Sequence, residues 1–192
     1  MDNPIYFNQF LNGHLPDAYR YFGAHHTVID GQDGYFFRCY APMAKQISVI
    51  GDFNNWDGSQ NIMQKVDYRG LFECFIPGAK EFQKYKLHIL GCDNFIKDKQ
   101  DPFAFCNEVR GETCSILLDI DQIHMDDAEF VSKRDRNFDR PVSIYEFHMG
   151  TFKRRADGSC YNYSELADIM IPYLKKMGYT HVEALPVTSY PN

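Results

Sequence analysis

Short segments in which apolar and polar residues alternate, separated by turn sequences, dominate the chain between residues 27 and 120. The turns are rich in Gly, Asp and Asn, as at 31–34, 51–58 and 91–94. Alternation with a period of two predicts strands that bury one face. The predicted strands span 35–40, 46–50, 71–76, 85–90 and 115–118. Short strands at this spacing predict an antiparallel, immunoglobulin-like β-sandwich, so the expected fold class is mainly β.

The pattern changes after residue 141. Segments 142–149 and 180–187 predict short buried strands, and Tyr163–Met177 between them has the apolar spacing of an amphipathic helix. A helix that connects two strands of one sheet makes them parallel. Such a unit is normally one part of a longer sheet with both faces covered, and the sequence stops at Asn192. We therefore expect this segment to be the front part of a larger domain.

The ends of the predicted helix carry clear signals. Asn162 stands at the N-cap with Glu165 three residues later, which is a capping box. Gly178 stands where a helix commonly ends in the left-handed conformation. Pro172 lies inside the helix, where it lacks an N–H donor, so we expect a kink there.

Composition and charge exclude several classes of function. The net charge of −6 and the pI near 5.6 argue against nucleic-acid binding, which needs a basic surface. No apolar run approaches the ~20 residues that span a bilayer, and the N-terminus does not resemble a signal peptide. We therefore expect no membrane partner and a cytoplasmic protein. The six cysteines form no C-x-x-C pair, so we expect reduced thiols, no metal site and no cofactor.

Motifs follow one another in a fixed order along the chain. They are DAYRYFGAH at 17–25, VIGDFNNWDG at 49–58, DPFA at 101–104, RGETCS at 110–115, SIYEFHMG at 143–150, ELA at 165–167 and GYTHVE at 178–183. On these motifs the chain resembles the 1,4-alpha-glucan (glycogen) branching enzymes of the alpha-amylase superfamily. Gly111 departs from the family pattern, since a proline commonly follows the arginine at that place.

The resemblance implies a division of the chain. Residues 1–14 would be an N-terminal lead-in, 15–120 a glycogen-binding-type β-sandwich, and 121–141 a charged linker. Residues 142–192 would be the first strand, helix and strand of a catalytic (β/α)8 barrel. The barrel would be incomplete, because it needs eight strands. The density of Asp, Arg and Lys in the linker independently indicates a surface connection.

The resemblance also implies an activity. Branching enzymes cleave α-1,4 glucosidic linkages and form α-1,6 linkages, by a retaining mechanism with an Asp nucleophile and a Glu acid. In the family those carboxylates lie on later barrel strands, and this sequence has no matching positions. No catalytic residue is therefore assigned, and we expect the 192 residues alone to be inactive. The expected partner is an α-glucan, such as glycogen or an amylose-like chain.

Other readings of the motifs stay open. The VIGDFNNWDG motif alone also fits debranching enzymes, trehalose-releasing hydrolases and kinase-linked glycogen-binding subunits, whereas DAYRYFGAH and SIYEFHMG favour branching enzymes. Two alternative functions are a stand-alone α-glucan-binding or scaffolding module and one piece of a split branching or debranching enzyme. In the second case another polypeptide would complete the barrel.

Five residues are candidates for contact with a glucan. Trp56 lies in a polar turn with Asn55 and Asp57, where its ring offers a flat apolar face and its neighbours offer hydrogen bonds. The alternative is that Trp56 packs on the sandwich or docks it to the barrel, because a large aromatic is more often buried. Lys86 is predicted to face solvent on an alternating strand. Tyr190 would lie at the C-terminal end of the second barrel strand, where such barrels hold their active sites.

Two glutamates on the predicted barrel strands offer a different chemistry. Glu146 and Glu183 each stand two residues from a histidine, at His148 and His181. A catalytic carboxylate pair is one interpretation. The other is that these groups satisfy one another inside a sheet that is buried on both faces. Because Glu146 is in the middle of its strand rather than at the C-terminal end, we interpret the group as structural.

Overall fold

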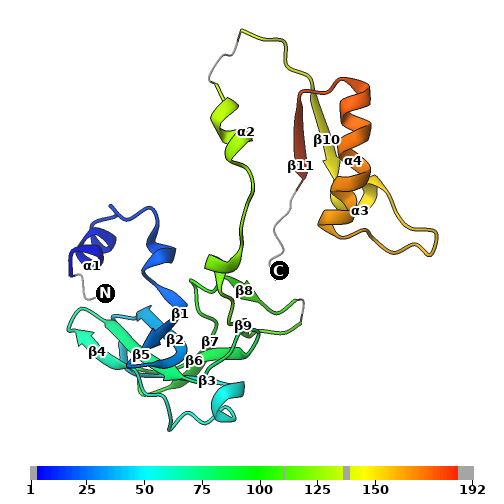
Figure 1. Ribbon diagram of the computed structural model, residues 1–192. Helices are drawn as coiled ribbons and strands as arrows, with labels where there is room; N and C mark the ends of the chain where they lie inside the picture. The colour runs from blue at the N-terminus through cyan, green and yellow to red at the C-terminus, as the bar shows by residue number, and fades with distance from the viewer. Residues whose placement is uncertain (1–3, 110, 136–138, 186–192) are drawn as a thin grey trace. The chain divides into compact units, whose positions relative to one another are not determined.

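The computed structural model describes residues 4–109, 111–135 and 139–185, and it divides into two compact units, Met1–His124 and Met125–Asn192 (Figure 1). The first unit is built mainly from antiparallel strands. Their bounds are β1 (Gly23–Ile29), β2 (Gln32–Tyr40), β3 (Ala44–Gly51), β4 (Gln64–Asp67), β5 (Leu71–Pro77), β6 (Lys84–Gly91), β7 (Ile96–Lys99), β8 (Cys106–Asn107) and β9 (Ser115–Ile116).

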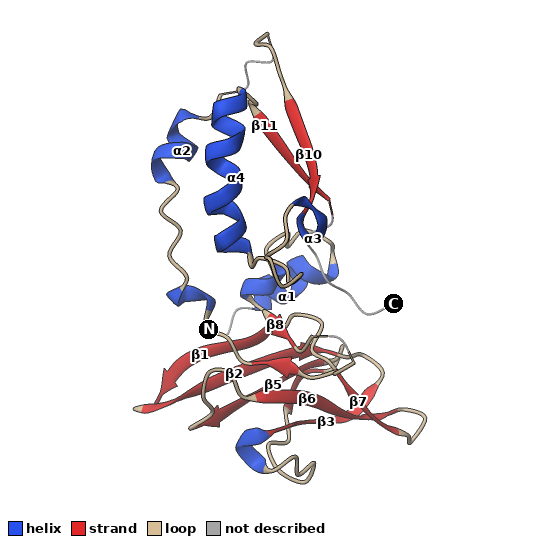
Figure 2. Ribbon diagram, turned by 90° about the vertical axis from the view of Figure 1, so that its right-hand side faces the viewer, coloured by secondary structure: helices blue, strands red, loops and turns tan. Residues whose placement is uncertain are grey.

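These strands form two antiparallel sheets, which are drawn in red in Figure 2. The four-stranded sheet has the order β1-β2-β5-β4. The five-stranded sheet has the order β3-β6-β9-β8, and β7 pairs with the second half of β6. The prediction of a mainly β fold with antiparallel sheets is confirmed.

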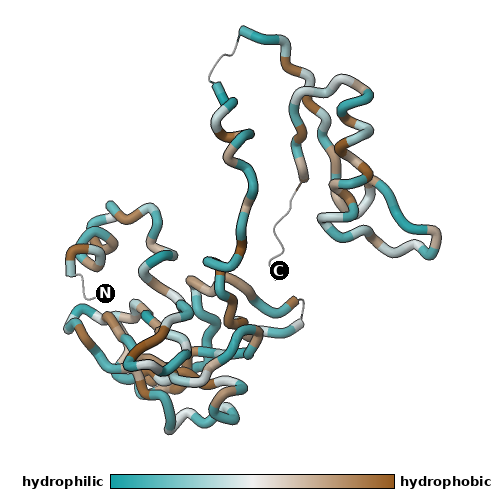
Figure 3. The backbone as a smooth tube through the Cα atoms, in the orientation of Figure 1, coloured by the Kyte–Doolittle hydropathy of each residue, from teal (hydrophilic) through white to brown (hydrophobic). Residues whose placement is uncertain are grey.

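Alternate residues of the strands form one core between the two sheets. Tyr35 and Phe37 of β2, and Tyr85 and Leu87 of β6, are each at most 2% exposed. The other members of this core are Ala24, Cys39, Ala44, Ile47, Val49, Met63, Phe72, Ile76, Ala79 and Leu117. Figure 3 shows apolar and polar stretches following one another along the strands. Because neighbouring residues point to opposite faces, Lys86 between Tyr85 and Leu87 lies outside the core.

Helix α1 (Pro4–Leu11) contributes to a second, aromatic core on the first unit. Phe7 of this helix is 1% exposed and clusters with Tyr21, Phe22 and Leu71. The rings of Phe10 and Phe22 lie with their centroids 4.4 Å apart. A 3-10 turn, η1 (Ala18–Arg20), precedes β1, and η3 (Ile120–Gln122) follows β9. The helix therefore extends the core of the sandwich beyond the two sheets.

The second unit pairs two parallel strands. Strand β10 (Ile144–His148) and strand β11 (His181–Leu185) lie in register, with Glu146 opposite Glu183. Between them run a short helix, α3 (Met149–Phe152), and the long helix α4 (Tyr163–Met177). Helix α2 (Ala128–Lys133) precedes β10 along the chain. The parallel strand–helix–strand order matches the sequence pattern.

Helix α4 begins and ends at the predicted signals. Asn162 Oδ1 accepts a hydrogen bond from Glu165 N, and Asn162 N donates to Glu165 Oε2, each at 2.9 Å. Gly178 ends the helix with φ 77°. The helix continues through Pro172 as one element. Among the described residues, no helix is long and apolar enough to cross a membrane.

The strands of the second unit are more exposed than their apolar sequence predicts. In β10 only Phe147 is buried, and every residue of β11 is exposed. The Tyr145 and Tyr173 rings, 5.8 Å apart at their centroids, mark the face of the sheet that α4 covers. The other face, with Glu146 and His148, is exposed. The expectation of strands buried on both faces is therefore wrong for the described residues: helix α4 covers one face of β10, and β11 is exposed on both faces.

Candidate functional site

The loop between β3 and β4 is organised around one buried amide side chain. Asn54, at the end of the 3-10 turn η2 (Asp52–Asn54), is 6% exposed. Its Nδ2 donates to Val49 O at 2.9 Å and to Asn61 Oδ1 at 2.7 Å. Its Oδ1 accepts from Gly51 N at 2.9 Å. These bonds join the start and the end of the loop, so the residues between them are held in a defined shape.

Trp56 stands on the outside of this loop. It is 38% exposed and has a left-handed backbone, with φ 62°. Its Nε1 donates to Asp52 Oδ1 at 3.2 Å, and Asp52 Oδ2 accepts from Lys84 N at 2.8 Å. Asp52 therefore ties the indole to the first residue of β6. In the first unit, the ring is held at the surface rather than packed into the core.

The two neighbours of Trp56 play different parts. Asn55 is exposed, and within the described part of the chain its side chain makes no hydrogen bond. Asp57 accepts from Ser59 Oγ at 2.7 Å, from Ser59 N at 2.9 Å and from Gln60 Nε2 at 2.8 Å. The Ser59 hydrogen bonds, and then that of Gln60, hold the pKa of Asp57 below its usual value. Asp57 thus shapes the loop as an anion, while Asn55 is available to a ligand.

Strand β6 supplies polar groups from the outer face of the five-stranded sheet. Lys86 Nζ donates to Thr113 Oγ1 at 2.7 Å, and Lys84 forms an ion pair with Glu108. That hydrogen-bonded pair raises the pKa of Lys84 and lowers the pKa of Glu108. His88 Nδ1 lies 2.7 Å from Asp98 Oδ1 of β7. Lysine, threonine, histidine and carboxylate groups therefore share one face.

The loop between β3 and β4 packs against this same face of the sheet. A Cβ added at Gly58 would lie 2.8 Å from His88 Nε2, so a larger residue there would force the His88 ring to move. Ser48 Oγ of β3 donates to Gly58 O at 2.8 Å. The loop that carries Trp56 therefore lies against the face of the sheet that carries Lys86. The residue types of Trp56 and Lys86 suit contact with a sugar, which presents an apolar ring face and hydroxyl groups.

Other candidates are placed elsewhere. Tyr190 lies outside the described residues. Glu146 and Glu183 are exposed, and within the described segments neither carboxylate has a hydrogen-bond or ion-pair partner. The expected mutual satisfaction with His148 and His181 is therefore not seen. Asp52 and Thr113 were not predicted from the sequence. For Asp52 the signal was its place in the motif, four residues before Trp56, whereas Thr113 has no such signal.

A family match covers the segment that holds this site. Residues 21–104 match Carbohydrate-binding module 48 (Isoamylase N-terminal domain). This segment is therefore similar to a carbohydrate-binding module 48. The match includes the loop with Trp56 and strand β6 with Lys86. The antiparallel sheets of the first unit agree with the β-sandwich expected of such a module.

Curated relatives extend the similarity to nearly the whole chain. It is 39% identical over 184 residues to the 1,4-alpha-glucan branching enzyme GlgB of Bacillus subtilis, covering 95% of this chain and 29% of the relative. It is 38% identical over 189 residues to GlgB 2 of Clostridium perfringens, covering 96% of this chain and 28% of the relative. The predicted resemblance to the branching enzymes is confirmed. The chain spans less than a third of the length of these relatives.

Solved structures share the fold at low sequence identity. Pullulanase type I from Bacillus subtilis, crystallised with maltose, aligns with a TM-score of 0.62 and 23% identity over 88% of this chain and 24% of that chain. The GBS pullulanase SAP, in complex with maltotetraose, aligns with a TM-score of 0.60 and 17% identity over 88% of this chain and 24% of that chain. At these identities the likeness describes the fold of the module and its neighbouring segment.

Proposed function

We propose that this chain is the N-terminal part of a 1,4-alpha-glucan branching enzyme and that its module 48 binds α-glucan. The observation that carries the proposal is the placement of Trp56, which Asp52 holds at the surface in a loop that lies against the face of the sheet with Lys86. The identity of 39% to a branching enzyme, over 95% of this chain, supports the assignment to glycogen synthesis.

The proposed contact follows from the chemistry of glucose. The ring of Trp56 stacks on the apolar face of one glucose unit, and the Asn55 amide reaches its hydroxyl groups. Lys86 and Thr113 add donors and acceptors for a neighbouring unit of the chain. Asp52 acts as a positioning residue, because it fixes the indole and does not itself face the ligand. The site recognises a neutral polysaccharide by shape and hydrogen bonds.

The second unit is proposed to begin the catalytic barrel. Its parallel β10 and β11 with the connecting α4 have the strand–helix–strand order of such barrels. The solved pullulanases align over 88% of this chain, which is more than the first unit contains. Cleavage of α-1,4 linkages and transfer to α-1,6 positions would belong to the longer enzyme. We propose that the 192 residues alone bind glucan without branching it.

Affinity electrophoresis tests the binding site. The wild-type chain is expected to be retarded in native gels that contain glycogen, and Trp56→Ala is expected to weaken retention by ~tenfold, equivalent to about 1.4 kcal/mol. Tyr68→Ala is the matched control, because Tyr68 is an 86% exposed aromatic in the turn between β4 and β5. Equal retention of wild type and Trp56→Ala, or equal loss in the control, would contradict the proposed site.

An iodine-spectrum assay tests the activity of the 192 residues. The pure chain should leave the spectrum of amylose unchanged, and any measurable branching would sink that part of the proposal. Copurification of a second polypeptide that confers branching would favour a split enzyme. Glycan retention without any such partner fits a binding module. The six cysteines are free thiols in the structure, which supports a reducing compartment, and we propose the cytoplasm.

A further inference from the structure

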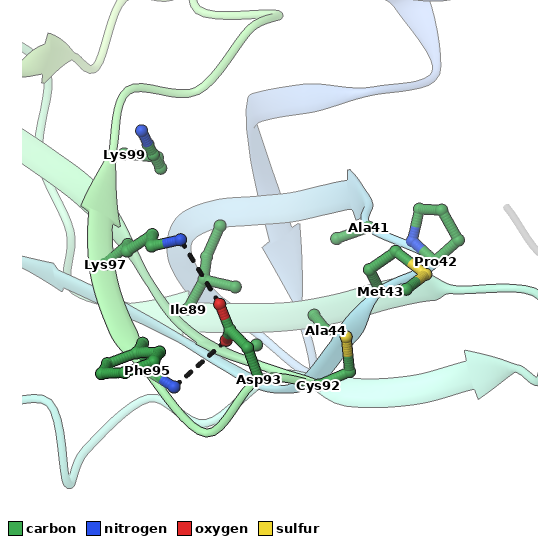
Figure 4. Close-up of a pocket in the computed structure, with 11 residues that line it drawn as sticks. Ala41, Pro42, Met43, Ala44, Ile89, Cys92, Asp93, Phe95, Lys97 and Lys99 are labelled. Carbon is green, nitrogen blue, oxygen red and sulfur yellow. Dashed lines mark hydrogen bonds and ion pairs between the residues drawn. The ribbon is translucent and has the colours of Figure 1, made fainter.

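A groove opens where the core of the sandwich ends, beside the hairpin that joins β6 and β7 (Figure 4). Along β6, Tyr85 is fully buried and Leu87 is 2% exposed, whereas Ile89 is only partly buried. The turn with Pro42 and Met43 forms the opposite wall. The cavity has a volume of about 290 Å³. That volume lies just below the ~300–1,000 Å³ range of pockets for drug-sized ligands, so it suits a ligand of monosaccharide size.

Large apolar side chains at the rim of this groove remain accessible. Phe95 is 67% exposed and Met43 is 68% exposed. The hairpin under Phe95 is fixed by its own side chains, since Asp93 Oδ1 accepts from Phe95 N at 3.1 Å. Lys45 Nζ also donates to Asn94 Oδ1 at 2.5 Å. The turn that precedes Phe95 is therefore held in a defined shape, and most of the Phe95 side chain is accessible beside the groove.

Two lysine side chains give one side of the groove a positive charge. Lys97 and Lys99 both line it, and they stand two residues apart on β7, ~6.6 Å along the strand. Lys97 Nζ is 3.5 Å from Asp93 Oδ2, a long ion pair between exposed groups. Lys99 has no hydrogen-bond or ion-pair partner within the described ranges, and Figure 4 shows it apart from Asp93. The two ammonium groups outnumber the single carboxylate, in a chain whose net charge is −6.

We propose that this groove binds a phosphorylated glucose unit, with its phosphoryl group between Lys97 and Lys99 and its ring against Phe95. A neutral glucose unit would leave Lys99 without a counter-charge and Lys97 with only the long ion pair to Asp93. Lysine is a common phosphate ligand and acts as a compact point charge on a flexible stem. The phosphorylated unit is either free hexose phosphate or a phosphoryl-bearing glucose residue within a glucan.

The groove is separate from the loop that carries Trp56. In β7, Asp98 faces His88 on the outer side of the sheet, and its strand neighbours Lys97 and Lys99 alternate with it. Strand alternation thus puts the two lysines on the opposite side of β7. The two sites share no side chain, so the phosphate site does not depend on the proposed glucan site.

Protection of Cys92 from a maleimide tests the proposal on the full chain. Cys92 lines the groove and is exposed, while Cys160 is an exposed thiol in the second unit. Peptide mass spectrometry follows both in one sample. Glucose 6-phosphate at ten times its dissociation constant is expected to slow labelling of Cys92 about tenfold and to leave Cys160 unchanged. Inorganic phosphate, glucose and maltoheptaose are expected to protect much less.

Variants separate this site from the glucan site. Lys99→Gln is expected to weaken protection by glucose 6-phosphate roughly tenfold and to keep retention in glycogen gels. Trp56→Ala is expected to weaken retention in glycogen gels and to keep the protection of Cys92 by glucose 6-phosphate. Lys80→Gln, which changes an exposed lysine outside the groove, is the matched control. Phosphorylated maltodextrin, compared with glucose 6-phosphate, distinguishes the two sources of the ligand.

Three results would overturn the proposal. Glucose could protect Cys92 as well as glucose 6-phosphate does, which would make the groove a neutral sugar site. Inorganic phosphate could protect equally, which would make it an anion site without a role for the ring of Phe95. Protection could also be absent, or the same in Lys99→Gln as in wild type at unchanged melting temperature. Any of these results leaves the glycogen retention of the module as a separate measurement.

Discussion

Two residues of the first unit, Asp52 and Asn54, keep other residues in position through hydrogen bonds. Asp52 accepts a hydrogen bond from the indole of Trp56 with one oxygen and from the backbone N–H of Lys84 with the other, so it sets the position of the ring. Asn54 does the same for the loop as a whole, from a buried position. The proposed binding face therefore depends on these internal contacts as much as on the residues that would meet the sugar.

Tyr35 offers a residue-scale test of the core. Its side chain is 1% exposed, and its hydroxyl has no hydrogen-bond partner in the described part of the chain. Burying an unpaired hydroxyl is unfavourable, so Tyr35→Phe is expected to raise the free energy of unfolding by about 1 kcal/mol in urea denaturation. Tyr68→Phe, which changes a tyrosine that is 86% exposed, should leave stability unchanged. A loss of stability in Tyr35→Phe would show that the hydroxyl is paired.

The same residue gives a pH dependence. Burial, followed by nearby Glu81, raises the pKa of Tyr35 from 10.0 to about 12. The folded state therefore keeps its proton where the unfolded state releases it. This contribution to stability is present below pH 10 and is lost as pH rises toward 12. The difference in stability between wild type and Tyr35→Phe, followed by urea unfolding across this range, should grow with pH; a constant difference contradicts the assignment.

The motifs predict which residues cluster at the loop, but not how exposed they are. The exposure of Trp56 depends on Asp52 meeting the backbone of Lys84, which is 32 residues later in the chain. Contacts of that separation leave no periodic signal. For Lys86 the alternation of β6 was sufficient, because its neighbours Tyr85 and Leu87 are strongly apolar. A role for Phe95 and Lys99 was not predicted from the sequence, because the residues of an exposed hairpin show no alternation of buried and exposed positions.

At the scale of secondary-structure elements, strong local signals produced accurate predictions. The bounds of α4 match Tyr163–Met177, because the capping box and the C-terminal glycine act within the helix itself. Edge strands were not predicted. Strand β4 and strand β7 consist mostly of charged and exposed residues, and they are held by backbone pairing to β5 and β6. Backbone pairing does not require an alternating pattern.

The capping box of α4 gives a prediction at this scale. Asn162→Ala removes the acceptor for Glu165 N and is expected to destabilise the helix by about 1 kcal/mol. Faster amide exchange in the first turn of α4, measured by hydrogen–deuterium exchange, should report the change. Asn162→Asp keeps a capping oxygen and is the matched control. Equal exchange in Asn162→Ala and wild type would mean that the interaction of Glu165 with Arg155 holds the end of the helix instead.

The two units of the chain differ in how many of their apolar side chains are buried. The sandwich encloses a large core, while the second unit buries Phe147, Leu166 and Leu174 and leaves one face of its sheet open. A unit with so small a core has little stability of its own. The segment 121–135, which contains the boundary between the two units, is exposed throughout. Its short helix α2 carries an ion pair between Lys133 and Glu129, and Asp135 pairs with Arg140.

Limited digestion with trypsin tests this organisation. Cleavage is expected first after Lys133 and Arg134, because proteases cut exposed segments with few contacts. Lysines within paired strands, such as Lys86, should resist. The N-terminal product, which contains the whole sandwich, should keep the retention of the intact chain in glycogen gels, since Trp56 and Lys86 both belong to the first unit. Early cleavage inside β6, or a stable product without glycogen retention, would show that the sandwich needs the second unit to hold its binding face.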